Sequence, residues 1–191
     1  WWLDRIVPEF DPSTTPERHV LGPVLAEVER RFGVRPPMVA LVGTSMGGQG
    51  ALRLSYRHPR VFPVAAAIAP AIDFHLALRD LHSIPDGELF ANLYPLYGDV
   101  ERARQDTAIL HVHPLDWPRH QWFASDPDDW QWHDGAARLH GKLGALGIPH
   151  TARLDLRAGG HGPAYYDRVA SRLRLEALED EADRLRRHPV V

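Results

Sequence analysis

The sequence has no cysteine, which excludes disulfides, thiolate catalysis and zinc–thiolate sites. Lysine is nearly absent as well, because Lys142 is the only one and arginine carries the rest of the basic charge. The formal net charge of −3 indicates neither a nucleic-acid-binding surface nor an acidic tail. No apolar run is long enough to cross a bilayer, and metal, nucleotide and flavin motifs are absent. We therefore expect no cofactor, no nucleic-acid partner and no membrane partner.

The 191 residues, 44% of them hydrophobic, are enough for one domain with a substantial core, which we place at residues 1–191. The chain opens Trp1-Trp2, without an initiator Met and without the basic and apolar regions of a signal peptide. We expect that an N-terminal part is missing, together with any targeting segment. The sequence leaves cellular location and oligomeric state open, with a cytoplasmic location slightly favoured.

Strands and helices alternate along the predicted secondary structure. Apolar or alternating segments predict four strands, at residues 38–42, 64–69, 121–124 and 151–156. Helical spacing and end signals predict four helices, at residues 15–33, 47–57, 134–146 and 163–187. This alternation predicts an α/β fold, with a mainly parallel sheet covered by helices on both faces.

Residues 70–117 interrupt this alternation with an irregular, proline-punctuated stretch. It contains aromatic residues at Phe74, Phe90, Tyr94 and Tyr97. A long irregular segment in a regular domain is typical of a lid or a substrate-facing insertion. We expect its aromatic side chains to shape a substrate pocket. For the charged residues Arg102, Arg104 and Asp106 we expect structural ion pairs, with contact to a polar substrate as the alternative.

The strongest motif is Gly43-Thr44-Ser45-Met46-Gly47-Gly48, between a predicted strand and a predicted helix. In that context G-x-S-x-G predicts a sharp turn that lifts a serine hydroxyl above the sheet, rather than a chance match in a glycine-rich loop. The residues two before and two after the serine should lack bulk, which explains Gly43 and Gly47. Ser45 is the predicted nucleophile, and the Met46 N–H at the start of the helix is the predicted oxyanion donor.

Among twelve histidines, His161 is the best candidate for a catalytic base. It lies in Gly159-Gly160-His161-Gly162, after the last predicted strand and before the last helix, where the base follows in the chain order serine, acid, histidine. The alternative is a turn histidine that caps the helix. His111 and His113 would supply only two metal ligands, so we expect no metal site there.

The acid should come from Ser125-Asp126-Pro127-Asp128-Asp129, which directly follows the predicted third strand. Asp128 is the first choice because the acid usually lies a few residues beyond the strand end. Asp129 and Asp126 remain alternatives, since spacing alone does not separate three aspartates and some of them serve only to form the turn.

With these residues in place, the chain resembles the esterase D-like branch of α/β hydrolases, which includes S-formylglutathione hydrolases and feruloyl and acetyl-xylan esterases. The resemblance rests on residues 43–52, the aspartate cluster at 126–129, Gly159-Gly160-His161 and the following Tyr165-Tyr166. It implies an α/β-hydrolase fold with Ser45 as nucleophile and His161 as base. Family members have several strands before the serine, including a loop with a second oxyanion donor. We therefore expect those strands to be absent here.

The predicted function is that of a serine esterase, which hydrolyses a small-molecule or carbohydrate-linked ester through an acyl-enzyme. Two alternatives remain: an acyltransferase on the same fold, and a non-catalytic hydrolase-like domain. The sequence does not identify the ester.

Overall fold

The structure is a computed structural model that describes residues 1–79 and 93–173. Its centre is a parallel four-stranded sheet in the order β1-β2-β3-β4. The strands are β1 (Ala40–Thr44), β2 (Val64–Ile68), β3 (His120–Ala124) and β4 (Thr151–Arg153). All four predicted strands are present, although β1 begins two residues late and β4 ends early. The predicted parallel α/β fold is confirmed.

The first helical stretch consists of three consecutive pieces: α1 (Pro16–His19), the π-helical turn η1 (Val20–Val24) and α2 (Leu25–Phe32). Thr15 Oγ1 accepts a hydrogen bond from Arg18 N at 3.1 Å and so caps the start. Pro23 lies inside η1 and has no N–H to donate, which explains why regular α-helical hydrogen bonding is interrupted there. Gly33 ends the stretch with φ +66°, a left-handed conformation that favours glycine.

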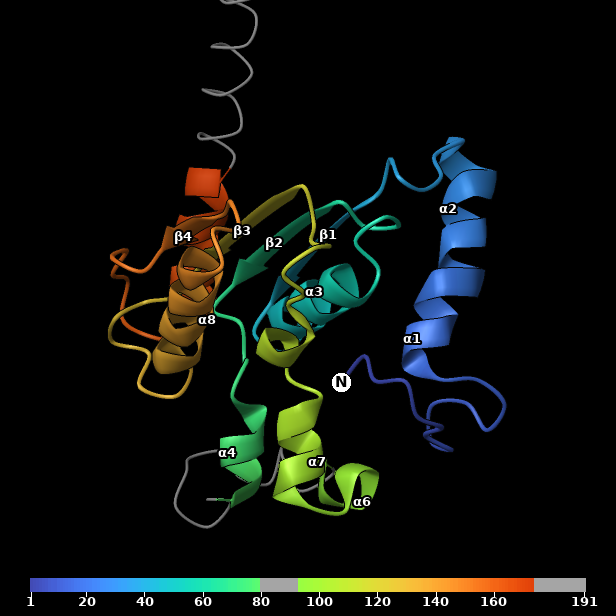
Figure 1. Ribbon diagram of the computed structural model, residues 1–191, viewed down its shortest axis with the longest axis horizontal. Helices are drawn as coiled ribbons and strands as arrows, with labels where there is room; N and C mark the ends of the chain where they lie inside the picture. Colours follow the sequence, from blue (N-terminus) through green and yellow to red (C-terminus); the bar gives the residue numbers. More distant parts are fainter. Residues whose placement is uncertain (80–92, 174–191) are drawn as a thin grey trace, which may run out of the picture.

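Helices cover both faces of the sheet (Figure 1). On one face, α3 (Met46–Arg57) and α8 (His133–Ala145) pack through Leu52 and Leu139 onto Phe123 of β3. On the other face, the helical residues 163–173 pack onto β2 and β3. Successive strand side chains point to opposite faces, so each strand contributes to both cores.

The segment between β2 and β3 is more helical than predicted. Its described residues form the short helices α4 (Phe74–Arg79), α6 (Leu93–Tyr97) and α7 (Val100–Gln105) and the 3₁₀ turn η2 (Ala108–His111). Figure 1 shows α4, α6 and α7 grouped beyond one end of the sheet.

The aromatic side chains of this segment form a core of their own. Phe74 is 1% exposed and Tyr97 is 2% exposed, and both pack with Leu3 and Trp132. The prediction that they shape an open substrate pocket is wrong for these two residues, because they are enclosed. Phe90 and the side chain of Tyr94 lie outside the described part of the chain, as do residues 174–187 of the predicted terminal helix.

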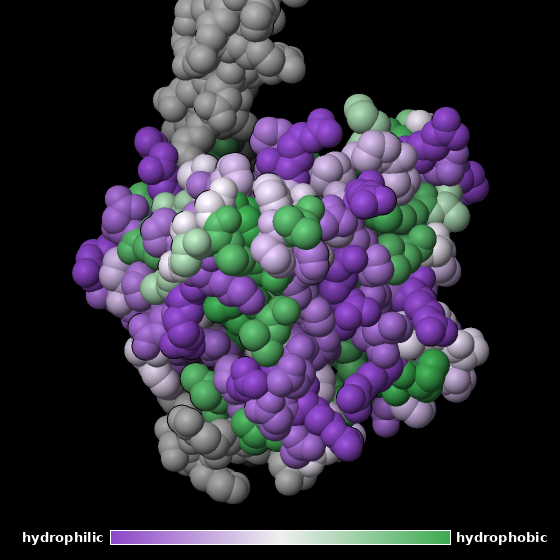
Figure 2. Space-filling view, in the orientation of Figure 1, coloured by the Kyte–Doolittle hydropathy of each residue, from purple (hydrophilic) through white to green (hydrophobic). Residues whose placement is uncertain are grey.

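Within the described ranges, β1 is an edge strand that pairs only with β2. Large apolar side chains are exposed near it: Met38 at 79% and Val42 at 66%. On α2, Phe32 is 72% exposed, and Figure 2 shows apolar surface on this side of the molecule. An unpaired edge presents backbone donors and acceptors to a further strand. Among the described helices, none combines the length and apolar character needed to span a bilayer.

Candidate active site

The turn from β1 to α3 holds Ser45 with φ +51° and ψ −118°, a conformation that is strained for a residue with a side chain. Tertiary hydrogen bonds stabilise this strained conformation. Ser45 N donates to Ile68 O of β2 at 2.9 Å, and Ser45 O accepts from Ala71 N at 3.1 Å. The turn is therefore fastened to the neighbouring strand end, and the hydroxyl lies at the carboxyl end of the sheet.

The glycines around Ser45 are not equivalent. A Cβ at Gly43 would overlap the carbonyl of Gly47, so the prediction for Gly43 is confirmed. A Cβ at Gly47 would meet nothing within 4 Å, so the prediction that this position must lack bulk is wrong. The crowded position on the helix side is Gly48, where a Cβ would lie 3.1 Å from Gly43 O and 3.2 Å from Pro70.

The structure brings His161 and Ser45 together across 116 residues of sequence. The Nε2 atom of His161 lies 3.0 Å from Ser45 Oγ, within hydrogen-bond distance. Gly159 and Gly160, with φ of +86° and +83°, make the left-handed turn that leads into His161. The carboxyl end of the sheet and this loop therefore place a hydroxyl and an imidazole in contact.

Asp129, rather than the first-choice Asp128, lies against His161. Its Oδ2 atom is 2.9 Å from His161 Nδ1, and its side chain is 1% exposed. The other oxygen, Oδ1, accepts hydrogen bonds from Gln131 N at 3.3 Å and Trp132 N at 3.2 Å. A carboxylate only accepts, so this contact places the Nδ1 proton between them and leaves Nε2 free to accept from Ser45.

Asp128 points away from His161 and forms an ion pair with Arg157. Both side chains are more than half exposed, at 55% and 61%. The prediction of Asp128 as the partner of the base therefore fails in this structure, because consecutive residues in a turn point in different directions.

Asp126 has a third role that the sequence did not reveal. Its buried carboxylate accepts backbone hydrogen bonds from Ala158 N at 2.6 Å and Gly160 N at 3.0 Å. Burial acts to raise the pKa of Asp126, but these hydrogen bonds and one from Asp128 N outweigh it and lower the pKa. Asp126 thus fastens the loop that carries His161 to the end of β3.

A tyrosine completes the group of polar atoms. The Tyr166 hydroxyl lies 2.8 Å from His161 Nε2, the same nitrogen that contacts Ser45 Oγ. Its ring meets the imidazole edge-on, with centroids 5.5 Å apart. Burial raises the pKa of Tyr166, against a smaller lowering by the Ser45 contact, so the phenol keeps its proton at neutral pH. Its position five residues after His161, at the start of a helix, is the signal that could have revealed it.

The Met46 N–H is the first of α3 and follows Ser45 directly. The first N–H groups of a helix have no acceptor within the helix, and the helix dipole makes this end positive. The arrangement is suited to a negatively charged oxygen beside Ser45 Oγ. The role of Met46 as oxyanion donor stays a prediction.

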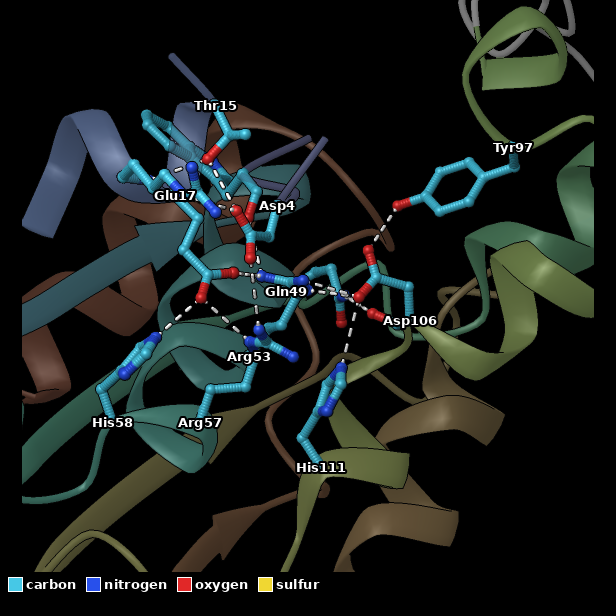
Figure 3. Close-up of polar contacts among 12 residues, drawn as sticks. Asp4, Thr15, Glu17, Gln49, Arg53, Arg57, His58, Tyr97, Asp106 and His111 are labelled. Carbon is cyan, nitrogen blue, oxygen red and sulfur yellow. Dashed lines mark hydrogen bonds and ion pairs between the residues drawn. The ribbon is translucent and has the colours of Figure 1, made fainter. Parts of the chain in front are cut away.

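A buried ion-pair network around Arg53 holds α3 in place (Figure 3). Arg53 of α3, 3% exposed, lies between two carboxylates: Glu17 of α1 at 2.5 Å and Asp106 at 2.6 Å. One turn nearer to Ser45, Gln49 Oε1 accepts from Ala108 N at 3.1 Å. Helix α3, which begins directly after Ser45, is thus fastened both to the N-terminal segment and to the segment after α7.

The carboxylates of this network are held ionised by their partners. For Glu17, burial is the largest influence and acts to raise the pKa, but hydrogen bonds from His58 and Arg53 outweigh it and lower the pKa. Asp106 behaves in the same way, with hydrogen bonds from His111 and Arg53 lowering its pKa.

The remaining residues singled out from the sequence have structural contacts. Arg102 and Arg104 pair with Asp99 and Glu101, as predicted. His111 Nε2 lies 3.3 Å from Asp106 Oδ1. In residues 1–79 and 93–173, no three His, Asp or Glu side chains are grouped so that they could hold a metal ion.

Comparison of the sequence with models of known families shows the family to which the chain belongs. The sequence model of a family described as "Putative esterase" matches residues 6–147, which is most of the chain. The chain belongs to this esterase family. The match includes Ser45 and the aspartate cluster, and the α/β-hydrolase fold of the esterase follows from it. No curated protein sequence is significantly similar to the chain.

Solved structures support the same fold for this esterase-family chain. An S-formylglutathione hydrolase from Agrobacterium tumefaciens superposes with a TM-score of 0.66 at 19% identity, over 96% of this chain and 62% of that one. A ferulic acid esterase gives a TM-score of 0.61 at 19% identity, over 83% and 58%. A capsule O-acetyltransferase of Neisseria meningitidis serogroup A gives 0.60 at 14% identity, over 89% and 65%. The chain therefore spans about three fifths of the length of these structures.

Proposed function

We propose that this chain carries the catalytic centre of a serine esterase, with Ser45 as nucleophile, His161 as base and Asp129 as the acid that orients the base. The observation that carries the proposal is the continuous contact Ser45 Oγ–His161 Nε2 and His161 Nδ1–Asp129 Oδ2, at 3.0 and 2.9 Å. A hydroxyl, an imidazole and a carboxylate in this order are the parts needed to activate a serine.

The reaction proceeds in two stages. His161 Nε2 takes the Ser45 proton while Oγ attacks the ester carbonyl carbon, and the Met46 N–H binds the resulting oxyanion. The imidazolium then gives this proton to the leaving alcohol, which leaves an acyl group on Ser45. Water attacks the acyl group in the same way and releases the acid. Hydrolysis is preferred to acyl transfer because the matching family is an esterase family.

The substrate class proposed is a small-molecule or carbohydrate-linked carboxylic ester. The names of the similar structures include hydrolases of formylglutathione and ferulic acid esters, and these names belong to those proteins. Nothing in the geometry requires a cofactor, because all the proton transfers use atoms of Ser45 and His161.

The test is covalent labelling of the chain with a fluorophosphonate, with the adduct mapped by mass spectrometry. We expect one adduct on Ser45, and neither labelling nor hydrolysis of p-nitrophenyl acetate after Ser45→Ala. Ser171→Ala is the matched control, because this hydroxyl lies on the last helix and donates to Asp167 O. Unchanged hydrolysis by Ser45→Ala would refute the assignment.

A further inference from the structure

His161 Nε2 has two hydroxyl partners where the proposed reaction needs only one. Ser45 Oγ lies 3.0 Å from this nitrogen and Tyr166 Oη lies 2.8 Å from it. The Nδ1 proton faces Asp129, so Nε2 has a single lone pair for both hydroxyls. The two hydroxyls therefore share this lone pair as their acceptor.

The Tyr166 hydroxyl lies beside the position that the leaving-group oxygen of the ester has to reach. During ester cleavage the leaving oxygen is bonded to the same carbon as Ser45 Oγ and must come within hydrogen-bond reach of Nε2, which protonates it. The Tyr166 hydroxyl, 2.8 Å from the nitrogen that also contacts Ser45 Oγ, is beside that position. The oxyanion, by contrast, is expected at the Met46 N–H, at the start of α3.

We infer that Tyr166 is a further catalytic residue, whose hydroxyl donates a hydrogen bond to the leaving-group oxygen during acylation. This inference rests on the proposed function. When the carbon–oxygen bond of the tetrahedral intermediate breaks, its electron pair goes to the leaving oxygen and the carbonyl reforms. The proton comes from His161 Nε2. Tyr166 keeps its own proton and stabilises the developing negative charge.

The surroundings of Tyr166 suit a donor. Burial holds the pKa of Tyr166 above its usual range, so the phenol is protonated at neutral pH. Its edge-on contact with the imidazole fixes the ring, and helical residues 163–173 support it. A donor that is already oriented needs no rearrangement when charge develops on the leaving oxygen.

The test compares acetate esters that form the same acetyl-enzyme but differ in leaving group. For Tyr166→Phe we expect kcat/KM for ethyl acetate to fall about 10- to 100-fold, the effect of losing one hydrogen bond to a developing charge. For p-nitrophenyl acetate we expect less than about a threefold change, because p-nitrophenolate leaves without assistance. Substituted phenyl acetates should fall between the two, in order of leaving-group basicity.

Tyr165→Phe is the matched control, since it removes the adjacent hydroxyl, which is buried and has no hydrogen-bond partner among the described residues. Tyr165→Phe should leave kcat/KM unchanged for both ethyl acetate and p-nitrophenyl acetate. If Tyr166→Phe lowers kcat/KM equally for all esters, Tyr166 serves only in packing. If it raises kcat/KM for all esters, the phenol blocks the base. Either result overturns the inference.

Fluorophosphonate labelling of Ser45 separates this inference from the proposed function. Labelling of Tyr166→Phe at the rate of the unaltered chain would show that the site is intact, so that the leaving-group series tests Tyr166 alone. Absence of labelling and turnover in the unaltered chain would overturn the proposed function, and this inference with it.

Discussion

Asp129 Oδ2 lies 2.9 Å from His161 Nδ1, although the two residues are 32 positions apart in the chain. Backbone N–H groups of the turn hold the other carboxylate oxygen, so the carboxylate has one orientation. Two neighbours in the same turn, Asp126 and Asp128, have different partners: the backbone of residues 158–160 and the side chain of Arg157.

Asp129→Asn should lower kcat about 10³- to 10⁴-fold, because an amide in place of the carboxylate favours the wrong imidazole tautomer. Asp128→Asn is the control, and it should change kcat less than about threefold, because exposed ion pairs contribute little. Steady-state hydrolysis of p-nitrophenyl acetate measures both. A larger loss of kcat in Asp128→Asn than in Asp129→Asn would identify Asp128 as the acid.

Gly43→Ala should lower the thermal stability by several degrees and abolish Ser45 labelling, because the added methyl group overlaps the backbone at Gly47. Gly47→Ala has open space around the new methyl group, and alanine is the better helix former by about 0.5–1 kcal/mol. We expect it to retain labelling with an unchanged or higher Tm. Differential scanning calorimetry compares the pair, and similar losses in both variants would contradict this account of the turn.

Arg53→Met should reduce the free energy of unfolding by about 3–5 kcal/mol, because it leaves the carboxylates of Glu17 and Asp106 without their shared buried partner. Arg30→Met removes an exposed pair with Glu27 and should cost less than about 1 kcal/mol. Urea denaturation measures both. Equal effects would mean that the buried network contributes no more than a surface pair.

Acid should destabilise the protein through the same network. The pKa values of Glu17 and Asp106 are lower in the folded chain than their ordinary values of 4.5 and 3.8. The stabilisation is therefore complete above these ordinary values and is lost as the pH falls below them toward the folded values. We expect the urea midpoint to fall progressively below about pH 4.5.

Glu17→Gln isolates one part of this pH dependence. It should lower stability at pH 7 and flatten the fall in urea midpoint below pH 4.5, because the titrating group is gone. Glu9→Gln, at an exposed carboxylate, is the control. An acid response that is as steep in Glu17→Gln as in the unaltered chain would show that other carboxylates carry it.

Patterns within short windows were sufficient for much of the fold. Strand and helix periodicities predicted all four strands, and the glycine pattern around Ser45 predicted a turn that the structure contains. Both succeed because alternation, helical spacing and tight turns depend on neighbours within a few residues. The helices between residues 70 and 117 were missed because their apolar residues pack among themselves and with Leu3, in a core that no local period reveals.

The sequence by itself therefore determined the parallel α/β architecture and the position of Ser45 on its turn, and it singled out, from twelve histidines, the one that contacts Ser45. Only the tertiary structure decided which of the three aspartates in residues 126–129 contacts His161, and it also revealed the contacts that Tyr166 and Arg53 make. The physical reason is the same in each case. The partners of a side chain depend on the hydrogen bonds and ion pairs that residues from distant parts of the chain supply, and spacing along the sequence does not contain them.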